Sequence, residues 1–471
     1  MTLRRGAWIA FLLAVLARIV VLCAFDGGAN RPLEGDEKGY AAVAGSLARG
    51  EGFQFTTSVV VPSRIKVMQS HGAQIELARR PGESDDLPRP PIPVPWPLRA
   101  FRAPLLSLVM APVYALSAGE PWALRGFCAL LGALSAPLAF LLATRLGGLR
   151  AGWIGGVAVA CWPSNAWLSA RVLSEPLDAV LLLAAADLLL RKRLAVGGAV
   201  LGLAILCRPG GLTAVVLAAG VGGSFADPGR RLRCAGAVLL AAAAVVAPWV
   251  ARNWVIFGRP LLVTSSGVTL FGGNNPRALS DTSMGITRGN FSPGKWVPPE
   301  VAMCPQFVGG IMDGTDAFLD DQWPAVDMYG WRSLGEAESD SRFSGMAWTW
   351  MRGNPRDAAE LACWKVVRFL DPDTRSEKED AGRKAVLGWL SWGLALPAIV
   401  VALATAAFRR TPAWWMAVAL LAGHLLTTVI TYGDARMRAP VEPALLALLV
   451  APFLAGLLPK WTAPAAPATL G

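Results

Sequence analysis

Two adjacent carboxylates, Asp36 and Glu37, stand out among the residues that could do chemistry. They come directly before a helical pattern at Ala41–Arg49, which a Gly-Glu-Gly segment ends. Such a pair could supply a general base or bind a cation. The structural alternative is a solvated helix cap, because acidic residues are favoured at helix N-termini. Spacing alone favours the cap.

A third acidic residue, Glu175, lies at the mouth of an apolar run. Ser174 could cap the helix that follows, with Pro176 in its first turn, and this explains both of those residues structurally. It does not explain an acid beside hydrocarbon. An ionisable side chain at that depth is a functional candidate by default.

Several arginines come directly before or after apolar runs on the same side as these acids. Arg252 and Asn253 follow a Pro-Trp-Val-Ala sequence, Arg436 and Arg438 precede the last apolar run, and Arg102 precedes a short one. These arginines could simply bind lipid headgroups. Alternatively, they could hold a phosphate, because the guanidinium fork matches its geometry. The sequence leaves both interpretations open.

The elements that position these residues are membrane helices. The chain has 471 residues, of which 54% are hydrophobic and only 16% charged, whereas soluble domains carry about a quarter charged residues. Its apolar runs approach the roughly 20 residues that cross a bilayer, and in hydrocarbon such runs must be helical. We therefore expect an all-α polytopic membrane protein with about ten transmembrane helices. The predicted spans are residues 7–25, 122–144, 151–169, 174–190, 194–207, 211–225, 234–251, 385–408, 412–431 and 438–458.

The net charge of +11 could suggest nucleic-acid binding, but its distribution argues against that function. Short connections between the apolar runs hold thirteen of the 44 basic residues and one of the 33 acidic ones, so that the rest of the chain has a net charge of −1. This asymmetry is the positive-inside pattern of a membrane protein, and it places those connections in the cytoplasm. We expect no nucleic-acid partner, but membrane lipids around the protein.

The run at 103–118 decides the topology. It is apolar but short, and it holds two prolines, Pro104 and Pro112. If it lies in the interface, every basic cluster faces the cytoplasm, so we expect a juxtamembrane interfacial helix. Both termini are then cytoplasmic, and the long polar segments Asp26–Arg102 and Arg252–Lys384 are outside. The expected organisation is a membrane module at 1–251 (first outer loop 26–102), an extracytoplasmic loop region at 252–384, and C-terminal transmembrane helices at 385–471.

The remaining sequence signals are weak. The first span resembles a signal peptide but is followed by no clear cleavage site, so we expect it to be retained. Cys304 and Cys363 lie in the second outer segment, where a disulfide between them is compatible with an oxidising compartment. No Cys or His spacing indicates a metal site.

The chemical motifs, in their order, resemble those of a known family. The chain is similar to the GT-C membrane glycosyltransferases, in particular the branch of the protein O-mannosyltransferases and the bacterial aminoarabinose transferases. The resemblance covers about residues 7 to 458. Its motifs are Asp36-Glu37 with Tyr40, Arg102-Ala103-Pro104-Leu105, Ser174-Glu175-Pro176-Leu177, Arg208-Pro209, Pro248-Trp249 with Arg252-Asn253, Arg436-Met437-Arg438 with Pro440, and Trp348–Lys365 as a helix-rich outer loop.

This resemblance implies a GT-C-like bundle in the bacterial cytoplasmic membrane, with its active site on the extracytoplasmic face. It implies that Asp36 is the catalytic base, that Glu37 places the acceptor or supports the site, and that Arg102 lies near the phosphate of a lipid carrier. Two features depart from the family pattern. Ala103 replaces the first of two usual prolines, and Phe101 replaces an acid that helps to hold a metal in some relatives.

Residues and resemblance together predict an inverting glycosyltransferase that moves a monosaccharide from a polyprenyl-phosphate carrier to an acceptor hydroxyl. Asp36 would take the proton of the acceptor, which is a lipid, glycan or protein. The expected phosphate ligands are arginines at 102, 252, 436 and 438, and the expected supporting residues are Tyr40, Glu175 and Asn253. No cofactor is required, although a divalent cation at Asp36 and Glu37 stays open.

Two other functions compete with this prediction. A lipid or glycan transporter would carry charged residues at mid-membrane, broken helices and repeated halves, whereas the acids here gather on one face. A ligase that moves a whole glycan from a diphosphate carrier would share the same class of fold.

Overall fold

A computed structural model describes residues 2–24, 28–55, 58–59, 92–93, 97–275, 278, 336–372, 389–407 and 411–458. Within these ranges the chain is almost wholly helical. Its β structure consists of the two-residue strands β1 (Ser58–Val59) and β2 (Ile92–Pro93), which pair antiparallel, and an isolated bridge between Phe55 and Leu98. The expected all-α class is confirmed.

The N-terminal part of the bundle is formed by α1 (Leu3–Ala24), α4 (Pro121–Ala133) and α5 (Ser135–Ala160). The last of these is two antiparallel arms rather than one rod. It turns at Gly147 and Gly148, where Gly148 has a φ of 78° that favours glycine. A Cβ on Gly152 would lie 1.9 Å from Oγ1 of Thr144, whereas eight residues of straight helix would separate them by about 12 Å. The first arm, together with α4, occupies the predicted span 122–144, and the second arm forms the first part of the predicted span 151–169.

A buried arginine joins α1 to these helices. Arg18 donates hydrogen bonds to the carbonyl of Gly132 (3.0 Å) and to that of Ala160 (3.3 Å), at the C-terminal ends of α4 and α5. Helix C-termini carry partial negative charge and unpaired carbonyls, which a guanidinium satisfies. We therefore assign Arg18 a structural role.

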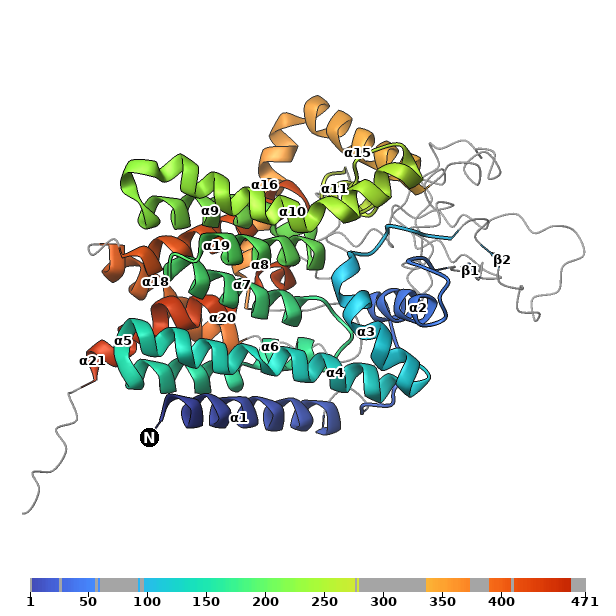
Figure 1. Ribbon diagram of the computed structural model, residues 1–471. Helices are drawn as coiled ribbons and strands as arrows, with labels where there is room; N and C mark the ends of the chain where they lie inside the picture. The colour runs from blue at the N-terminus through green and yellow to red at the C-terminus, as the bar shows by residue number, and fades with distance from the viewer. Residues whose placement is uncertain are drawn as a thin grey trace, which may run out of the picture.

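The remaining long helices complete the bundle (Figure 1). Small residues let them approach closely, as is usual between membrane helices. A Cβ on Gly423 would lie 2.2 Å from Cα of Ala214, and one on Gly202 would lie 2.6 Å from the carbonyl oxygen of Ala242. The long helices are α7 (Glu175–Leu190), α8 (Leu194–Cys207), α9 (Leu212–Ala226), α10 (Arg231–Phe257), α18 (Leu394–Ala407) and α19 (Pro412–Ile430). The short helical pieces are α6 (Pro163–Ser169), η1 (Pro209–Gly211), η2 (Pro228–Arg230), η4 (Trp389–Gly393), η5 (Ala435–Arg438), α20 (Glu442–Leu445), η6 (Leu446–Val450) and α21 (Ala451–Leu457).

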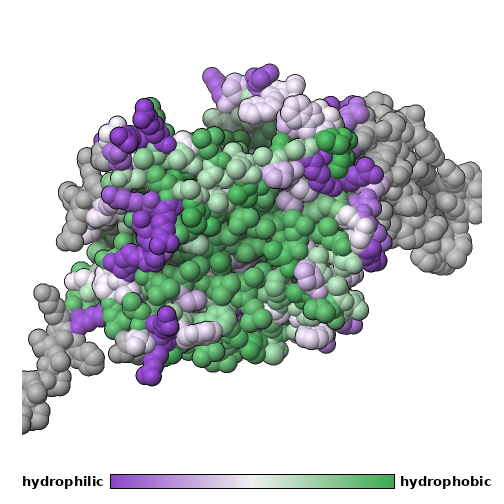
Figure 2. Space-filling model, in the orientation of Figure 1, coloured by the Kyte–Doolittle hydropathy of each residue, from purple (hydrophilic) through white to green (hydrophobic). Residues whose placement is uncertain are grey.

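Large apolar side chains cover the outside of the bundle, including Leu12, Leu240 and Val255. Figure 2 shows an apolar surface across the middle of the molecule, with hydrophilic residues toward its two ends. Among the residues that the structure describes, five helical stretches are long and apolar enough to cross a membrane, and they are Leu3–Cys23, Pro121–Ala160, Pro209–Ala226, Arg231–Phe257 and Pro412–Ile430. Shorter apolar helices lie in the predicted spans at 194–207, 385–408 and 438–458, of which residues 385–388 and 408 are outside the described ranges. The chain is a multi-pass membrane protein.

One end of the bundle gathers the helices of the two long polar segments. It holds α2 (Asp36–Ala48), α3 (Pro104–Ser117), α11 (Ser266–Gly273) and part of α15 (Glu336–Gly353), with α16 (Pro355–Leu370) along the side (Figure 1). The N-terminus and the turn of α5 lie at the opposite end. The 14-residue α3 packs against α2 at this end. Its position in the membrane interface stays a prediction.

Candidate active site

Asp36 opens α2 and points toward two arginines from distant parts of the chain. Its Oδ1 lies 2.8 Å from Nη1 of Arg102, and its Oδ2 lies 2.9 Å from Nη2 of Arg436. The charge of Arg102, followed by the charge and hydrogen bond of Arg436, holds the pKa of Asp36 well below its usual range in spite of burial. Asp36 is therefore ionised throughout the physiological pH range.

Glycine at position 39 lets Arg102 reach this carboxylate. The guanidinium of Arg102 crosses α2 so closely that a Cβ on Gly39 would lie 2.7 Å from its Nε. Arg102 also stacks near the rings of Tyr40 and Phe101, with its Cζ 5.4 and 5.1 Å from the ring centroids. Aromatic faces attract a cation at these distances.

Arg436 connects Asp36 to a second, buried carboxylate. Its Nε donates a short hydrogen bond to Oε1 of Glu175, whose side chain is only 1% exposed at the start of α7. Nη1 of Arg208 lies 2.9 Å from the same oxygen. The result is a string of alternating charges in the order Arg102, Asp36, Arg436, Glu175 and Arg208. Distant segments of the sequence thus supply one cluster, as a single active site requires.

Tyr40 lies one turn after Asp36 and contacts the start of α7. Its hydroxyl donates to Oγ of Ser174 (3.1 Å), which also accepts from Nη1 of Arg208 (3.3 Å). Burial raises the pKa of Tyr40, so its hydroxyl stays protonated and can donate. The predicted cap differs, because Ser174 is the N-cap of α7 by position but makes no capping hydrogen bond with its side chain.

These residues line one end of a pocket of about 520 Å³. Asp36, Tyr40, Arg102, Arg208 and Arg436 form the charged end. Asp434 also lines the pocket. Much of the remaining wall comes from α9, α11, α19 and neighbouring turns, and it combines apolar and hydroxyl side chains, among them Leu212, Thr213, Leu262, Val263, Ser265, Ser266, Thr269, Thr427, Ile430 and Thr431. A pocket of this size accommodates a small ligand. Its charged end combines a proton acceptor with donors that can hold an anion.

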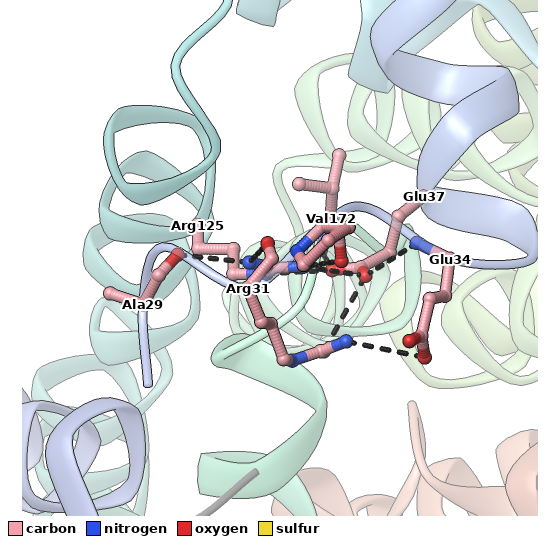
Figure 3. Close-up of polar contacts among 7 residues, drawn as sticks. Ala29, Arg31, Glu34, Glu37, Arg125 and Val172 are labelled. Carbon is pink, nitrogen blue, oxygen red and sulfur yellow. Dashed lines mark hydrogen bonds and ion pairs between the residues drawn. The ribbon is translucent and has the colours of Figure 1, made fainter. Parts of the chain in front are cut away.

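Glu37 points away from this pocket, although the sequence paired it with Asp36 in the chemistry. Both of its oxygens bind Arg125 of α4, at 3.0 and 2.9 Å, and Oε1 also accepts from the backbone nitrogen of Val172 (Figure 3). Consecutive residues on a helix point about 100° apart, so one carboxylate enters the pocket while the next is buried. The structure therefore indicates that Glu37 ties together the first loop, α4 and the segment before α7.

Arg125 explains why this tie is strong. Besides Glu37, its guanidinium donates to the carbonyls of Ala29, Arg31 and Pro32, which lie in the segment that leads into α2 (Figure 3). Every contact fixes the start of α2, and hence Asp36. Burial by itself would raise the pKa of Glu37. The hydrogen bonds from Arg125 and Val172 lower this pKa by more, so that it lies below its usual value.

The structure brings two predicted phosphate ligands into the pocket and leaves two outside it. Arg438 is 1% exposed and pairs with Glu442 (2.9 Å), while its Nη1 donates to backbone carbonyls. Arg252 donates to the carbonyls of Phe53 and Arg99. Asn253 is buried and donates to the carbonyl of Leu261. Packing thus occupies all three side chains, in contrast to the role that the sequence suggested for them.

Arg208 is a charged pocket residue to which the sequence analysis assigned no role. It follows α8 directly, contacts Glu175 and Ser174, and lines the pocket. The signal was present, because Arg208-Pro209 was one of the motifs of the family resemblance. From sequence, an arginine at a helix end could bind either a lipid headgroup or a ligand in a site. Only the pairing of Arg208 with the buried Glu175 distinguishes these two interpretations.

The two carboxylates at which the sequence left a divalent cation open, Asp36 and Glu37, bind arginines in this structure. A cation shared by Asp36 and Glu37 would have to displace the arginine and backbone donors of Glu37. Of the two cysteines expected to pair, Cys363 is exposed on α16 and Cys304 lies outside the described residues, so the disulfide stays a prediction.

Comparisons with known proteins place the chain beside membrane enzymes of low sequence identity. The sequence matches no known family and no curated protein. Among solved structures, it is similar to the apo oligosaccharyltransferase of Archaeoglobus fulgidus, with 12% identity, a TM-score of 0.49, and coverage of 94% of this chain and 50% of that one. ArnT from Cupriavidus metallidurans, solved with undecaprenyl phosphate, has 14% identity, a TM-score of 0.38, and coverage of 93% and 76%.

The chain is also similar to the archaeal oligosaccharyltransferase AglB from Archaeoglobus fulgidus in complex with an inhibitory peptide and a dolichol-phosphate. Here the identity is 13%, the TM-score is 0.46, and the coverage is 94% of this chain and 50% of that one. The chain spans about half the length of the archaeal enzymes. These likenesses concern the course of the backbone alone.

Proposed function

We propose that this protein is an inverting glycosyltransferase that moves a monosaccharide from a polyprenyl-phosphate carrier to an acceptor hydroxyl. The observation that carries the proposal is the position of Asp36 between Arg102 and Arg436, inside a pocket at one end of a membrane bundle. A carboxylate beside two guanidiniums offers a base next to an anion site. The order of the motifs, which resembles that of GT-C glycosyltransferases, supports a sugar phosphate as the ligand.

The residues suggest how the transfer would proceed. Asp36 accepts the proton of the acceptor hydroxyl while the hydroxyl oxygen forms a bond to the anomeric carbon. The bond from that carbon to the phosphate oxygen breaks, and the polyprenyl phosphate leaves with its negative charge. Arg102 and Arg436 stabilise that charge. A single displacement inverts the configuration at the anomeric carbon.

The surroundings of the pocket fit a lipid-linked donor. The charged end lies beside the apolar wall formed by α9 and α19, and the bundle that carries it is apolar outside. A carrier could therefore keep its chain in the bilayer while its phosphate meets the arginines. We place the site on the extracytoplasmic face of a bacterial cytoplasmic membrane, with both termini inside, because basic connections mark the cytoplasmic side.

A donor panel tests the class of reaction. Purified protein is incubated with radiolabelled polyprenyl-phosphate sugars and, in parallel, with a polyprenyl-diphosphate sugar, and release of the carrier is measured beside the Asp36→Asn variant. The proposal predicts carrier-dependent sugar transfer from one of the monophosphates that the variant loses. Transfer from the diphosphate alone would favour a ligase. Binding of a carrier without any turnover in the wild type would instead favour a transporter.

A further inference from the structure

The carboxylate assigned as the base has neither oxygen free. Arg102 occupies Oδ1 of Asp36 and Arg436 occupies Oδ2, both through charged hydrogen bonds under 3 Å. Charge-assisted bonds of this kind are about twice as strong as neutral ones. A general base has to accept a proton, and a carboxylate so engaged has a low affinity for one. As it stands, the geometry is that of a base held inactive.

The two arginines differ in what else they can bind. Arg436 also pairs with a second carboxylate, because its Nε contacts the buried Glu175, to which Arg208 also binds. It can therefore withdraw its Nη2 from Asp36 and stay anchored. Within the described residues, Arg102 has Asp36 as its one ion-pair partner, and its buried Nε has no hydrogen-bond partner. Arg102 thus has donor capacity that Asp36 does not use.

We infer that the phosphate of the donor, on entering the pocket, draws Arg102 and Arg436 away from Asp36 and thereby releases this carboxylate to act as the base. The inference rests on the proposed function. Arg102 and Arg436, which bind the phosphate of the donor, thereby also couple donor binding to activation of the base. Glu175, which Arg208 also holds, retains Arg436 during the exchange.

The electrostatics of the site support this exchange of partners. The charged and titratable groups that face Asp36 or its partners are Arg102 from the segment before α3, Arg436 and Asp434 at η5, Tyr40 on α2 itself, and the pair of Glu175 and Arg208 beside Arg436. Arg208 pairs with Glu175, whereas Arg102 and Arg436 contact Asp36 directly. A phosphate anion that binds both guanidiniums neutralises the charges that lower the pKa of Asp36, so its proton affinity rises. Donor binding would then precede deprotonation of the acceptor.

The test measures the protonation of Asp36 directly, without turnover. Infrared difference spectra of the full chain in lipid nanodiscs, with Asp36→Asn to identify the Asp36 band, are recorded over a pH titration. The probes are undecaprenyl phosphate and, as a comparison, inorganic phosphate, and calorimetry records binding separately. Undecaprenyl phosphate should move the midpoint of Asp36 upward by roughly one pH unit or more. Bound carrier with an unmoved midpoint would overturn the inference and leave the proposed function intact.

Variants distinguish the proposed release of Asp36 by donor binding from a purely structural role of Arg102 and Arg436. Arg436→Gln and Arg102→Gln should each raise the midpoint of Asp36 without any carrier and reduce the shift that the carrier causes. The matched control is Arg49→Gln, which removes an exposed arginine paired with Glu51 on the same loop; its midpoint should equal that of the wild type. An unchanged midpoint in Arg436→Gln would refute the inference. No binding of any carrier, seen by calorimetry, would overturn the inference and the proposed function together.

Discussion

Arg102 packs so closely on Gly39 that any side chain at position 39 would require Arg102 to move. A Cβ there would lie 2.7 Å from Nε of Arg102 and 3.3 Å from its Nη2. The backbone of Gly39 is helical, so conformational freedom does not explain the glycine. The space that it leaves is filled by the guanidinium that pairs with Asp36.

Gly39→Ala should therefore displace Arg102 and weaken sugar transfer. We expect kcat/KM for the donor to fall about tenfold, the equivalent of about 1.4 kcal/mol, with little change in thermal stability, because α2 gains a better helix former. Steady-state transfer at varied donor concentration measures this effect. Gly45→Ala on the same helix, where the added Cβ would meet Tyr114 instead, controls for crowding in α2. Wild-type kinetics in Gly39→Ala would contradict the positional role of Arg102.

Glu37 and Arg125 should matter for stability more than for chemistry. Their side chains are 2% and 1% exposed, and removal of one partner from a buried ion pair typically costs 3–5 kcal/mol. Glu37→Ala should thus lower the melting temperature in detergent by several degrees. Glu37→Gln keeps the shape and an oxygen acceptor, so its loss should be smaller. A catalytic role would instead abolish turnover in Glu37→Gln protein that remains folded.

The outer helix α15 should respond to pH through Asp340, whose Oδ1 accepts from the backbone nitrogen of Gly267. Burial, with a contribution from Glu336, raises the pKa of Asp340 to about 6, above its usual value of 3.8. The folded state then binds more protons than the unfolded state between these values, so the free energy of unfolding falls as pH rises from about 4 to 6.

Asp340→Asn should remove this dependence, because it keeps an acceptor oxygen and cannot ionise. The melting temperature of the variant relative to the wild type should therefore rise as pH increases from 4 to 7. Glu338→Gln, an exposed neighbour on α15, controls for the loss of one acid. A constant difference between Asp340→Asn and the wild type across this range would show that Asp340 does not titrate there.

The sequence predicted the helical class and the paired spans on either side of Gly147, because apolar length is a local signal. The role of Asp36 as the base stays a prediction. The sequence could not predict which arginines reach Asp36. Arg436 lies 400 residues from Asp36 in the sequence. The residues around Arg436 and Arg438 do not show which of the two arginines reaches Asp36. Only packing shows that Glu442 takes Arg438, whereas Glu175 and Asp36 share Arg436.

The same limit applies to Asp36 and Glu37. Their adjacency suggested a shared function, but the helix turns the second carboxylate toward Arg125, which no motif marked. Residues that line one pocket can be inferred from sequence when they share a membrane face. The partners of each side chain depend on contacts between helices, and these contacts cannot be predicted from the sequence alone.

A comparison of Asp36→Asn with Glu37→Gln under single-turnover conditions tests the central claim most directly. Both variants replace one carboxylate by its amide at neighbouring positions, and sugar transfer from a polyprenyl-phosphate donor is followed in folded protein. The account predicts that Asp36→Asn slows the chemical step by about 10²–10⁴-fold, whereas Glu37→Gln stays within about tenfold of the wild type. Near-normal transfer by Asp36→Asn, or an equal loss in Glu37→Gln, would contradict the assignment of Asp36 as the base.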